Sequence, residues 1–346
     1  DRALVANAEE STSFYLMKGV DPSKDQSYFL WTLRQEQLSK ILFPLACLYS
    51  FISSRIRKPK LIYNSSAKIM TIGNITMGGA GKTPVVLSIA KILKNNSNKK
   101  ISILTRGYKG KLNGPIMVEN HHTIKDVGDE ALLLKKEAPT CISKNRIEGI
   151  KFLEKQGYDI IITDDGLQDK RFFKNLSILV IDSYFGLGSE IIFPAGPLRE
   201  TLSSGLSKAD LALIIGNGNY KLNSKTTPIL RANIINKILL TNEKLVAFAG
   251  IGNPNKFFQT IKDAEADIVD QVSFPDHHEY SKKDLEKLIK LAKEHDAKLI
   301  TTEKDYVRIS QGYQDKIKTL PIELIWEENE ILMKEINTKL LDKKDF

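Results

Sequence analysis

The chain has few cysteines and no apolar run long enough to cross a membrane. Only 2 of its 346 residues are cysteines, Cys47 and Cys141, and they form no C-x-x-C motif. This excludes a disulfide-stapled fold and a cysteine-based zinc site, and it indicates a reducing compartment. The most apolar run, residues 41–52, is well short of the roughly 20 apolar residues that a spanning helix needs.

Recognition features of nucleic-acid-binding proteins are also missing. The net charge is +9, yet the sequence has no zinc finger, no RNP-like aromatic stretch and no helix of concentrated arginines. Nucleic acid therefore ranks below an anionic membrane surface or a phosphorylated substrate as a partner, and no obligatory protein partner is evident. The alternative is that the charge only solvates helix faces, because much of it is dispersed lysine.

A short amphipathic segment lies near the start of the chain. Its apolar residues follow helical spacing and are Leu38, Ile41, Leu42, Leu45, Leu48, Tyr49 and Ile52. The cations Arg55, Arg57, Lys58 and Lys60 follow directly. This pattern predicts, within residues 29–60, a helix that lies in the headgroup region of an anionic leaflet. The alternative is a first helix docked on the core. Residues 1–28 are an unassigned extension.

From Lys68 onward, strand patterns alternate with helical patterns. Continuous apolar runs such as "YDIIITDDG" suit strands buried on both faces, and the alternation favours a doubly wound parallel sheet. A polar stretch at 217–244 is interpreted as a linker or two short strands. We therefore predict a larger α/β domain over 61–216 and a smaller α/β lobe over 245–346, with a cleft between them.

The most informative stretch is "TIGNITMGGAGKTP", residues 71–84, between a predicted strand and a predicted helix. It ends like a phosphate-binding loop, although Thr76 stands where the usual pattern has glycine. Such a loop needs converging backbone amides, a lysine for the phosphates and a hydroxyl for Mg²⁺. The predicted triphosphate contacts are Thr76, Met77, Gly78, Gly79, Ala80, Gly81, Lys82 and Thr83. The alternative is a structural glycine-rich turn.

Two acidic pairs lie near this loop in the predicted sheet. Asp164 and Asp165 follow a buried strand, at the carboxyl edge where α/β proteins bind ligands. Adjacent side chains diverge on a strand, so we expect different roles for the two; an Asp-Asp-Gly turn is the alternative. Asp129 and Glu130 begin a predicted helix, where they could simply favour its N-terminus.

These motifs together resemble the tetraacyldisaccharide 4′-kinase family of lipid A biosynthesis. The resemblance covers about residues 29–310 and rests on the ordered set "FPLACLY", "GNITMGGAGKTP", "TRGY", "VGDEALLL", "DDGLQD", "FPAGPLRE", "FAGIGNP", "FPDHHEY" and "TEKD". The family's own loop also lacks the first glycine, so Thr76 is a family trait. The family pattern "DDGFQ" reads Asp164-Asp165-Gly166-Leu167-Gln168 here.

The resemblance implies a kinase at the cytoplasmic face of the bacterial inner membrane. It would transfer the γ-phosphoryl of ATP to the 4′-hydroxyl of a tetraacyldisaccharide 1-phosphate, giving lipid IVA, with Mg²⁺ as cofactor. Asp129 would activate the hydroxyl, His277 of the second lobe would be its partner, and Lys82 would hold the transferring phosphate. The implied metal ligands are Thr83, Glu130, Asp164 and Asp165, and the implied substrate contacts are Arg106 and Arg199.

Two other functions remain possible from the residues. One is a membrane-recruited P-loop ATPase or GTPase switch, although the loop lacks the additional early lysine of such proteins between Ile75 and Met77. The other is a soluble kinase for a small metabolite, which leaves residues 38–60 unexplained.

Overall fold

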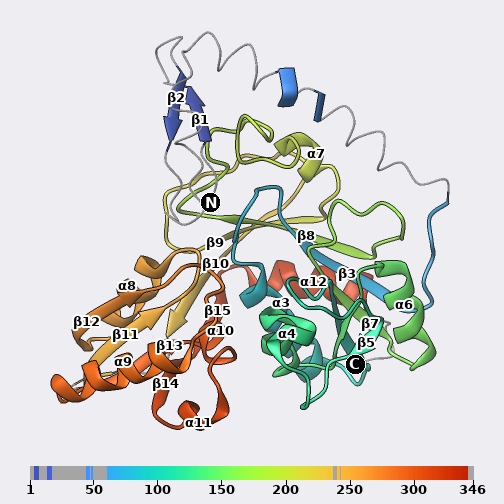
Figure 1. The fold of residues 1–346 in the computed structure, drawn as a ribbon. Helices are drawn as coiled ribbons and strands as arrows, with labels where there is room; N and C mark the ends of the chain where they lie inside the picture. The colour runs from blue at the N-terminus through green and yellow to red at the C-terminus, as the bar shows by residue number, and fades with distance from the viewer. Residues whose placement is uncertain are drawn as a thin grey trace.

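The computed structural model describes residues 4–7, 14–17, 44–46, 48–49, 61–236, 240–241 and 243–341. From residue 61 onward these form two α/β lobes, each built on its own sheet (Figure 1). Near the start of the chain, β1 (Leu4–Asn7) and β2 (Phe14–Met17) pair antiparallel in a separate two-stranded sheet.

The larger lobe is built on a nine-stranded sheet. Its strands are β3 (Lys68–Gly73), β4 (Ile101–Thr105), β5 (Ile116–Met117), β6 (Thr140–Ile142), β7 (Ile160–Asp164), β8 (Leu176–Asp182), β9 (Leu211–Ile215), β10 (Ile229–Asn236) and β15 (Ile322–Trp326). Their order is β15-β10-β9-β8-β3-β7-β4-β6-β5. The inner strands all run parallel, and the edge strands β15 and β5 are antiparallel to their neighbours.

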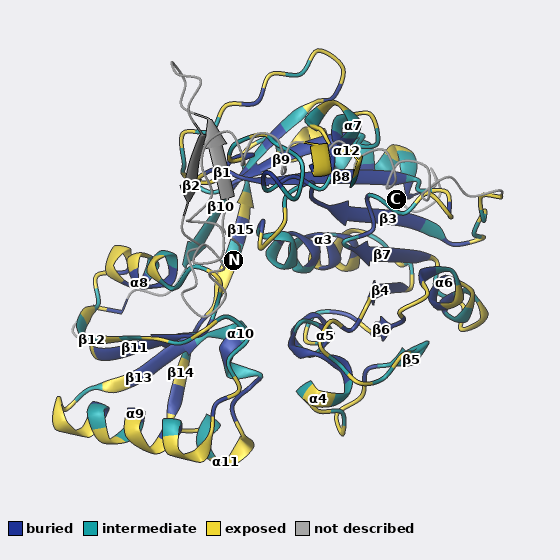
Figure 2. Ribbon diagram, turned by 45° about the horizontal axis from the view of Figure 1, so that its top comes forward, coloured by how far each residue is buried: buried dark blue, intermediate teal, exposed yellow. Residues whose placement is uncertain are grey.

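Helices cover both faces of this sheet (Figure 2). They are α3 (Lys82–Asn96), α4 (Ile124–Val127), α5 (Asp129–Lys135), α6 (Arg146–Lys155), α7 (Leu202–Leu206) and α12 (Asn329–Lys339). Successive residues of β7 divide between the two faces: Ile160 and Ile162 belong to the core with α3 and α12, whereas Ile161 belongs to the core with α6. The prediction of a doubly wound parallel sheet is thereby confirmed.

The smaller lobe has a four-stranded parallel sheet. Its strands are β11 (Lys244–Ala249), β12 (Asp267–Ser273), β13 (Lys298–Thr302) and β14 (Ile317–Leu320), in the order β12-β11-β13-β14. Its helices are α8 (Pro254–Asp263), α9 (Lys282–Glu294), α10 (Glu303–Tyr306) and α11 (Gln311–Gln314). Phe258 of α8 and Leu288 of α9 lie in separate cores, so these two helices pack on opposite faces of the sheet.

The chain passes between the lobes twice, and this changes the predicted division. Strand β10 falls inside the stretch 217–244, which was interpreted as a linker or two short strands, and it pairs in the large sheet between β9 and β15. Residues 322–341, assigned by sequence to the smaller lobe, return to the larger one as β15 and α12. The second crossing is short, because only Pro321 separates β14 from β15. Local pattern could not reveal this, since an edge strand is specified by its distant partner.

Little of the predicted membrane helix can be compared with the structure. Most of residues 29–60 lies outside the described residues, but Pro44–Ala46 and Leu48–Tyr49 are helical. Leu45 and Leu48 are exposed, while the Tyr49 ring packs edge-on against Phe193 at 5.5 Å. Within the described parts of the chain, no helix combines the length and apolar character needed to cross a bilayer.

Candidate active site

The glycine-rich loop joins the end of β3 to the start of α3 at the carboxyl edge of the parallel strands. Positive φ falls on Gly78 (121°) and Gly81 (74°) and not on Thr76, which explains why a threonine fits where the common pattern has glycine. The loop is held from within, because the buried Asn74 amide donates to the Thr76 carbonyl at 3.1 Å. A β-carbon added at Gly78 or Gly79 would meet nothing within 4 Å, so the loop surrounds open space.

Lys82, at the first turn of α3, points back across this loop. Its Nζ donates to Asn74 Oδ1 at 3.1 Å and lies 3.4 Å from Asp165 Oδ1. Thr83 follows in the same helical turn. An ammonium group and backbone amides at a helix N-terminus form an environment suited to phosphate oxygens.

The adjacent acids have different surroundings, because Asp164 is the last residue of β7 and Asp165 lies in the turn after it, with a positive φ of 56°. Asp164 is buried, and its Oδ1 has no hydrogen-bond partner. Burial and the nearby Glu130 carboxylate raise the pKa of Asp164 to about 7, against the opposing effect of Lys82. Asp165 instead pairs with Arg199, whose Nη1 lies 3.0 Å from both carboxylate oxygens. Burial would raise the pKa of Asp165, but Lys82 and Arg199 lower it to about 2.

The two arginines predicted to bind substrate are placed differently. Arg199 is brought to the phosphate loop by its backbone, which donates to the Ile75 carbonyl at 2.7 Å. Its side chain is occupied by Asp165. Arg106, directly after β4, is exposed at the same edge of the sheet. Both therefore lie on the rim of the predicted nucleotide site.

This arrangement fits a magnesium-bound triphosphate. Asp164 Oδ1 is buried without a hydrogen-bond partner, and the Glu130 carboxylate raises the pKa of Asp164, so a divalent cation between these two acids would be stabilised even though Glu130 also has Lys304 3.5 Å away. In the described residues no group of three or more His, Cys, Asp or Glu side chains could hold a metal alone. Magnesium is commonly bound through one or two carboxylates together with phosphates. Thr83, Glu130 and Asp164 are the candidate ligands, whereas Asp165 is engaged with cations.

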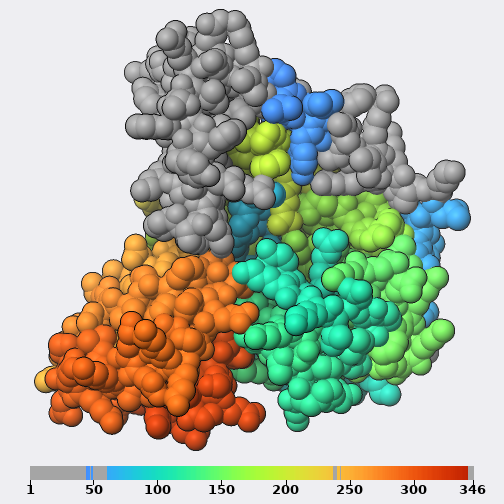
Figure 3. Space-filling model, in the orientation of Figure 1, coloured from blue at the N-terminus to red at the C-terminus, as the bar shows by residue number. Residues whose placement is uncertain are grey.

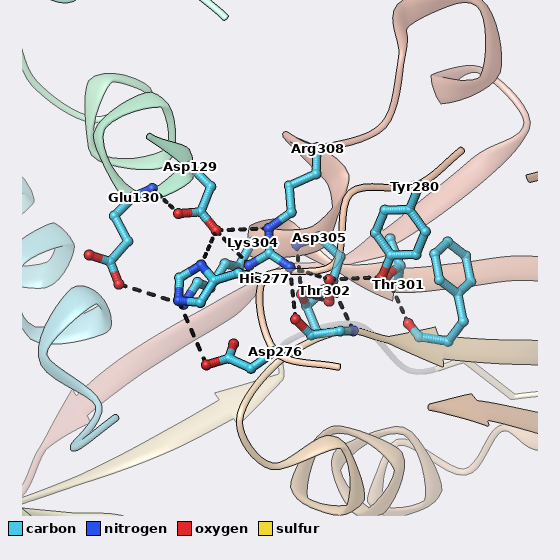
Figure 4. Close-up of polar contacts among 12 residues, drawn as sticks. Asp129, Glu130, Asp276, His277, Tyr280, Thr301, Thr302, Lys304, Asp305 and Arg308 are labelled. Carbon is cyan, nitrogen blue, oxygen red and sulfur yellow. Dashed lines mark hydrogen bonds and ion pairs between the residues drawn. The ribbon is translucent and has the colours of Figure 1, made fainter. Parts of the chain in front are cut away.

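Asp129 and His277 meet across the two lobes. Asp129 is the first residue of α5, and Gly128 before it has φ 85°, where a β-carbon would lie 2.2 Å from the Tyr108 carbonyl oxygen. His277 follows β12 and also has positive φ, at 63°, which is uncommon for a non-glycine residue. Its Nδ1 lies 2.8 Å from Asp129 Oδ2 (Figure 4). In Figure 3 the lobes meet along this side, where residues around 105–140 (teal) abut the second lobe (orange).

The neighbouring His278 does not share this position. Its Nε2 lies 3.3 Å from Asp284 Oδ2, and its ring stacks on Phe274 at 4.6 Å. Of the two adjacent histidines, His277 is the one the structure brings to Asp129, as the sequence analysis favoured.

Arg308 and Lys304, which the sequence analysis did not single out, complete this cluster from α10 and the turn after it. Arg308 Nε and Nη2 lie 2.8 and 2.6 Å from Asp129 Oδ2, and Lys304 Nζ lies 3.5 Å from Glu130 Oε1. Burial would raise the pKa of Asp129, but the His277 hydrogen bond and the charges of Arg308 and Lys304 hold that pKa well below its usual range. The available sequence clue was "TEKDYVR", in which Asp305 and Arg308 are spaced to pair along a helix.

Comparisons with known proteins identify the family of this chain. The family model described as tetraacyldisaccharide-1-P 4′-kinase matches residues 38–341. A tetraacyldisaccharide 4′-kinase of Paramagnetospirillum magneticum is 37% identical over 86% of this chain and 94% of its own length. One of Bradyrhizobium diazoefficiens is 35% identical over 86% of this chain and 91% of its own.

Among solved structures, LpxK from Aquifex aeolicus in complex with ATP is similar to this chain with a TM-score of 0.72. It is 25% identical, and the match covers 88% of this chain and 99% of that one. A second family model, a tRNA methyl transferase HUP domain, matches residues 3–59, most of which lie outside the described residues. With a matching model over residues 38–341 and relatives of this identity and coverage, the chain belongs to the tetraacyldisaccharide-1-phosphate 4′-kinase family.

Proposed function

We propose that this chain transfers the γ-phosphoryl group of ATP to the 4′-hydroxyl of a tetraacylated disaccharide 1-phosphate, forming lipid IVA. The observation that carries the proposal is the Asp129–His277 contact of 2.8 Å, which joins the lobe with the phosphate loop to the second lobe. Membership of the kinase family supports the same reaction. A switch ATPase has no need of an acid–imidazole pair beside its phosphate loop.

In this reaction a bond forms between the acceptor hydroxyl oxygen and the γ-phosphorus, while the bond from that phosphorus to the β-phosphate oxygen breaks. The transition state of phosphoryl transfer is loose, so positioning and charge neutralisation do most of the work. Lys82 would hold the transferring group, and Arg106 and Arg199 would contact phosphates at the rim. Bound Mg²⁺, held by Thr83, Glu130 and Asp164, would neutralise negative charge on the triphosphate.

The acceptor proton would pass to the Asp129–His277 pair. Asp129 Oδ2 already accepts from His277 and Arg308, whereas Oδ1 accepts only the adjacent Glu130 amide, at 2.9 Å, among the contacts described. Oδ1 is therefore the oxygen open to the hydroxyl. His277 would orient the carboxylate through Nδ1 and share the proton. Because the two residues belong to different lobes, the base is complete only when the lobes are together.

The acylated acceptor gives a reason for membrane contact. The exposed Leu45 and Leu48, next to the cations of residues 55–60, support a peripheral position on an anionic leaflet. We place this at the cytoplasmic face of the inner membrane, where ATP is present. The acyl chains then stay in the leaflet and only the sugar enters the site.

The test is incorporation of radiolabelled γ-phosphate into the disaccharide 1-phosphate presented in detergent micelles with Mg²⁺. The expected product carries one additional phosphate. An acceptor already phosphorylated at the 4′ position is the matched control and should take up no label. Partner-stimulated ATP hydrolysis without transfer to the disaccharide would overturn the proposal in favour of a switch.

A further inference from the structure

We infer that Arg308 is a positioning residue for this phosphoryl transfer, reaching from the second lobe to fix the Asp129 carboxylate beside His277. The inference rests on the proposed function and adds a third member to the pair. Arg308 would touch neither nucleotide nor acceptor, and would act only through Asp129.

The contacts of the Arg308 guanidinium fix its orientation. Nε and Nη2 lie 2.8 and 2.6 Å from Asp129 Oδ2, and Nη1 donates to the Gly250 carbonyl at 2.7 Å. Only 1% of the side chain is exposed. Both nitrogens face one carboxylate oxygen, where Nε makes the hydrogen bond and Nη2 adds charge without one. The planar guanidinium therefore orients Asp129 through a fixed donor, whereas a lysine would supply a single point charge.

Asp305 holds Arg308 from behind. Its Oδ1 accepts from Arg308 Nη1 at 2.9 Å, from the Tyr280 hydroxyl at 2.9 Å and from the Gly250 amide at 3.0 Å. Asp305 is itself completely buried. Figure 4 shows the resulting line of contacts from Asp129 through Arg308 to Asp305 and Tyr280. This support limits movement of Arg308 relative to the second lobe.

Gly250 ties Arg308 to His277. Its carbonyl oxygen accepts both from Arg308 Nη1 at 2.7 Å and from the His277 amide at 2.9 Å. A β-carbon there would lie 3.1 Å from Asp305 Oδ1 and 3.2 Å from His278 Cβ, so glycine suits this close packing. The two groups that hold Asp129 Oδ2 therefore share one anchor, and they reach the acid together.

A role in positioning differs from a role in folding alone because the contact crosses between lobes. Asp129 starts a helix of the larger lobe, while Gly250 and Asp305 belong to the smaller one. The position of the Asp129 carboxylate thus depends on how the two lobes meet, because Arg308 of the smaller lobe holds Asp129 of the larger one. Loss of this hold should slow the chemical step while leaving the phosphate loop intact.

The experiment compares Arg308→Met, Arg308→Lys and Arg308→Ala with the full-length parent protein, measuring kcat, the KM for ATP and the thermal unfolding midpoint. The matched control is Arg171→Ala. Arg171 also holds a carboxylate with two nitrogens, which lie 2.9 and 2.7 Å from the oxygens of Asp169. Unlike Arg308, its side chain is 45% exposed, and it precedes β8, several strands away from β5 and β6, between which Asp129 lies in the chain. We expect Arg308→Met to lower kcat about 100-fold, the effect of a misplaced reacting group, with the KM for ATP changed less than about threefold.

Arg308→Lys keeps the charge and provides a folded variant if Arg308→Met does not fold. It should recover part of the lost kcat. Millimolar guanidinium should raise the kcat of Arg308→Ala severalfold, by occupying the vacated space, and should leave Arg171→Ala and the parent unchanged.

Near-parental kcat in Arg308→Met or Arg308→Ala would overturn the inference. So would a kcat loss that follows the loss of folded protein and is unaffected by guanidinium. If the parent itself phosphorylates no acceptor, the proposed function fails; if the parent is active and the variants are too, only this inference fails.

Discussion

Lys174 provides a pH-dependent test of the packing beneath the Asp164–Asp165 turn. Its Nζ donates to the Leu167 carbonyl at 2.8 Å. Burial, reinforced by the charges of Lys208 and Arg146 and opposed by Asp169, lowers the pKa of Lys174 from 10.5 to about 8. A pKa difference of one unit is worth about 1.4 kcal/mol. The lowered pKa of Lys174 can therefore change the free energy of unfolding by at most roughly 3 kcal/mol between low and high pH. Partial solvent contact reduces the expected effect to about 2 kcal/mol.

The sign follows from the protons bound in each state. Between about pH 8 and 10.5 the unfolded chain keeps a proton on Lys174 that the folded protein has lost. The free energy of unfolding contributed by this residue therefore rises with pH across that window, and at neutral pH the buried charge is destabilising. Replacing Lys174 by Met removes both effects. We compare the free energy of unfolding of Lys174→Met with that of the parent. This difference should be about 2 kcal/mol less favourable to the variant at pH 10 than at pH 7, because only the parent is stabilised as the pH rises.

The assay is urea unfolding of parent and variant at pH 7 and pH 10, with Lys170→Met, exposed in the same segment, as the control. The lost bond to the Leu167 carbonyl destabilises the variant at both pH values, so the change between pH 7 and pH 10, and not either value alone, reports the titration of Lys174. Parallel pH dependence of the parent and Lys174→Met would refute the reasoning.

Three further predictions concern the site itself. Lys82→Ala should lower kcat by about 10²–10³, as does loss of a charged donor to a transition state, while the unfolding midpoint stays near that of the parent. His277→Ala should lower kcat more than it weakens ATP binding measured by calorimetry; the reverse pattern would assign it to nucleotide affinity. Asp305→Ala should lower the free energy of unfolding by about 3–5 kcal/mol, because Arg308 loses one of its buried partners. Exposed Asp267→Ala in the same lobe should change it by less than 0.5 kcal/mol, and equal losses in the two would contradict the buried network.

Much of the larger lobe could be predicted from residues close in sequence. A run such as Ile160-Ile161-Ile162 identifies a strand buried on both sides, and the structure places these residues in two different cores. That feature depends on alternation along one strand, which sequence records directly. Asp164 and Asp165 also diverge, as expected, but for another reason: β7 ends at Asp164, and Asp165 lies in a turn with a positive φ of 56°.

Features that depend on residues distant in the sequence were harder to predict. Strand β10 pairs with β15, about 90 residues later, so the polar stretch 217–244 around it was interpreted as a linker or two short strands. The Arg308–Asp129 contact spans 179 positions, and the only local pattern at its Arg308 end, the spacing of Asp305 and Arg308, does not indicate Asp129. The Asp129–His277 pairing spans 148 positions and was predicted only through the family resemblance. Resemblance thus supplied what local spacing could not.

The single residue between β14 and β15 has a consequence for motion between the lobes. Proline has a restricted φ, so Pro321 makes one of the two crossings a stiff joint. Opening of the molecule would then be a swing about this point. In such a swing, the displacement of one lobe relative to the other grows with distance from Pro321. A small bend at this residue therefore opens a wider gap between facing surfaces that lie far from it than between those that lie near it.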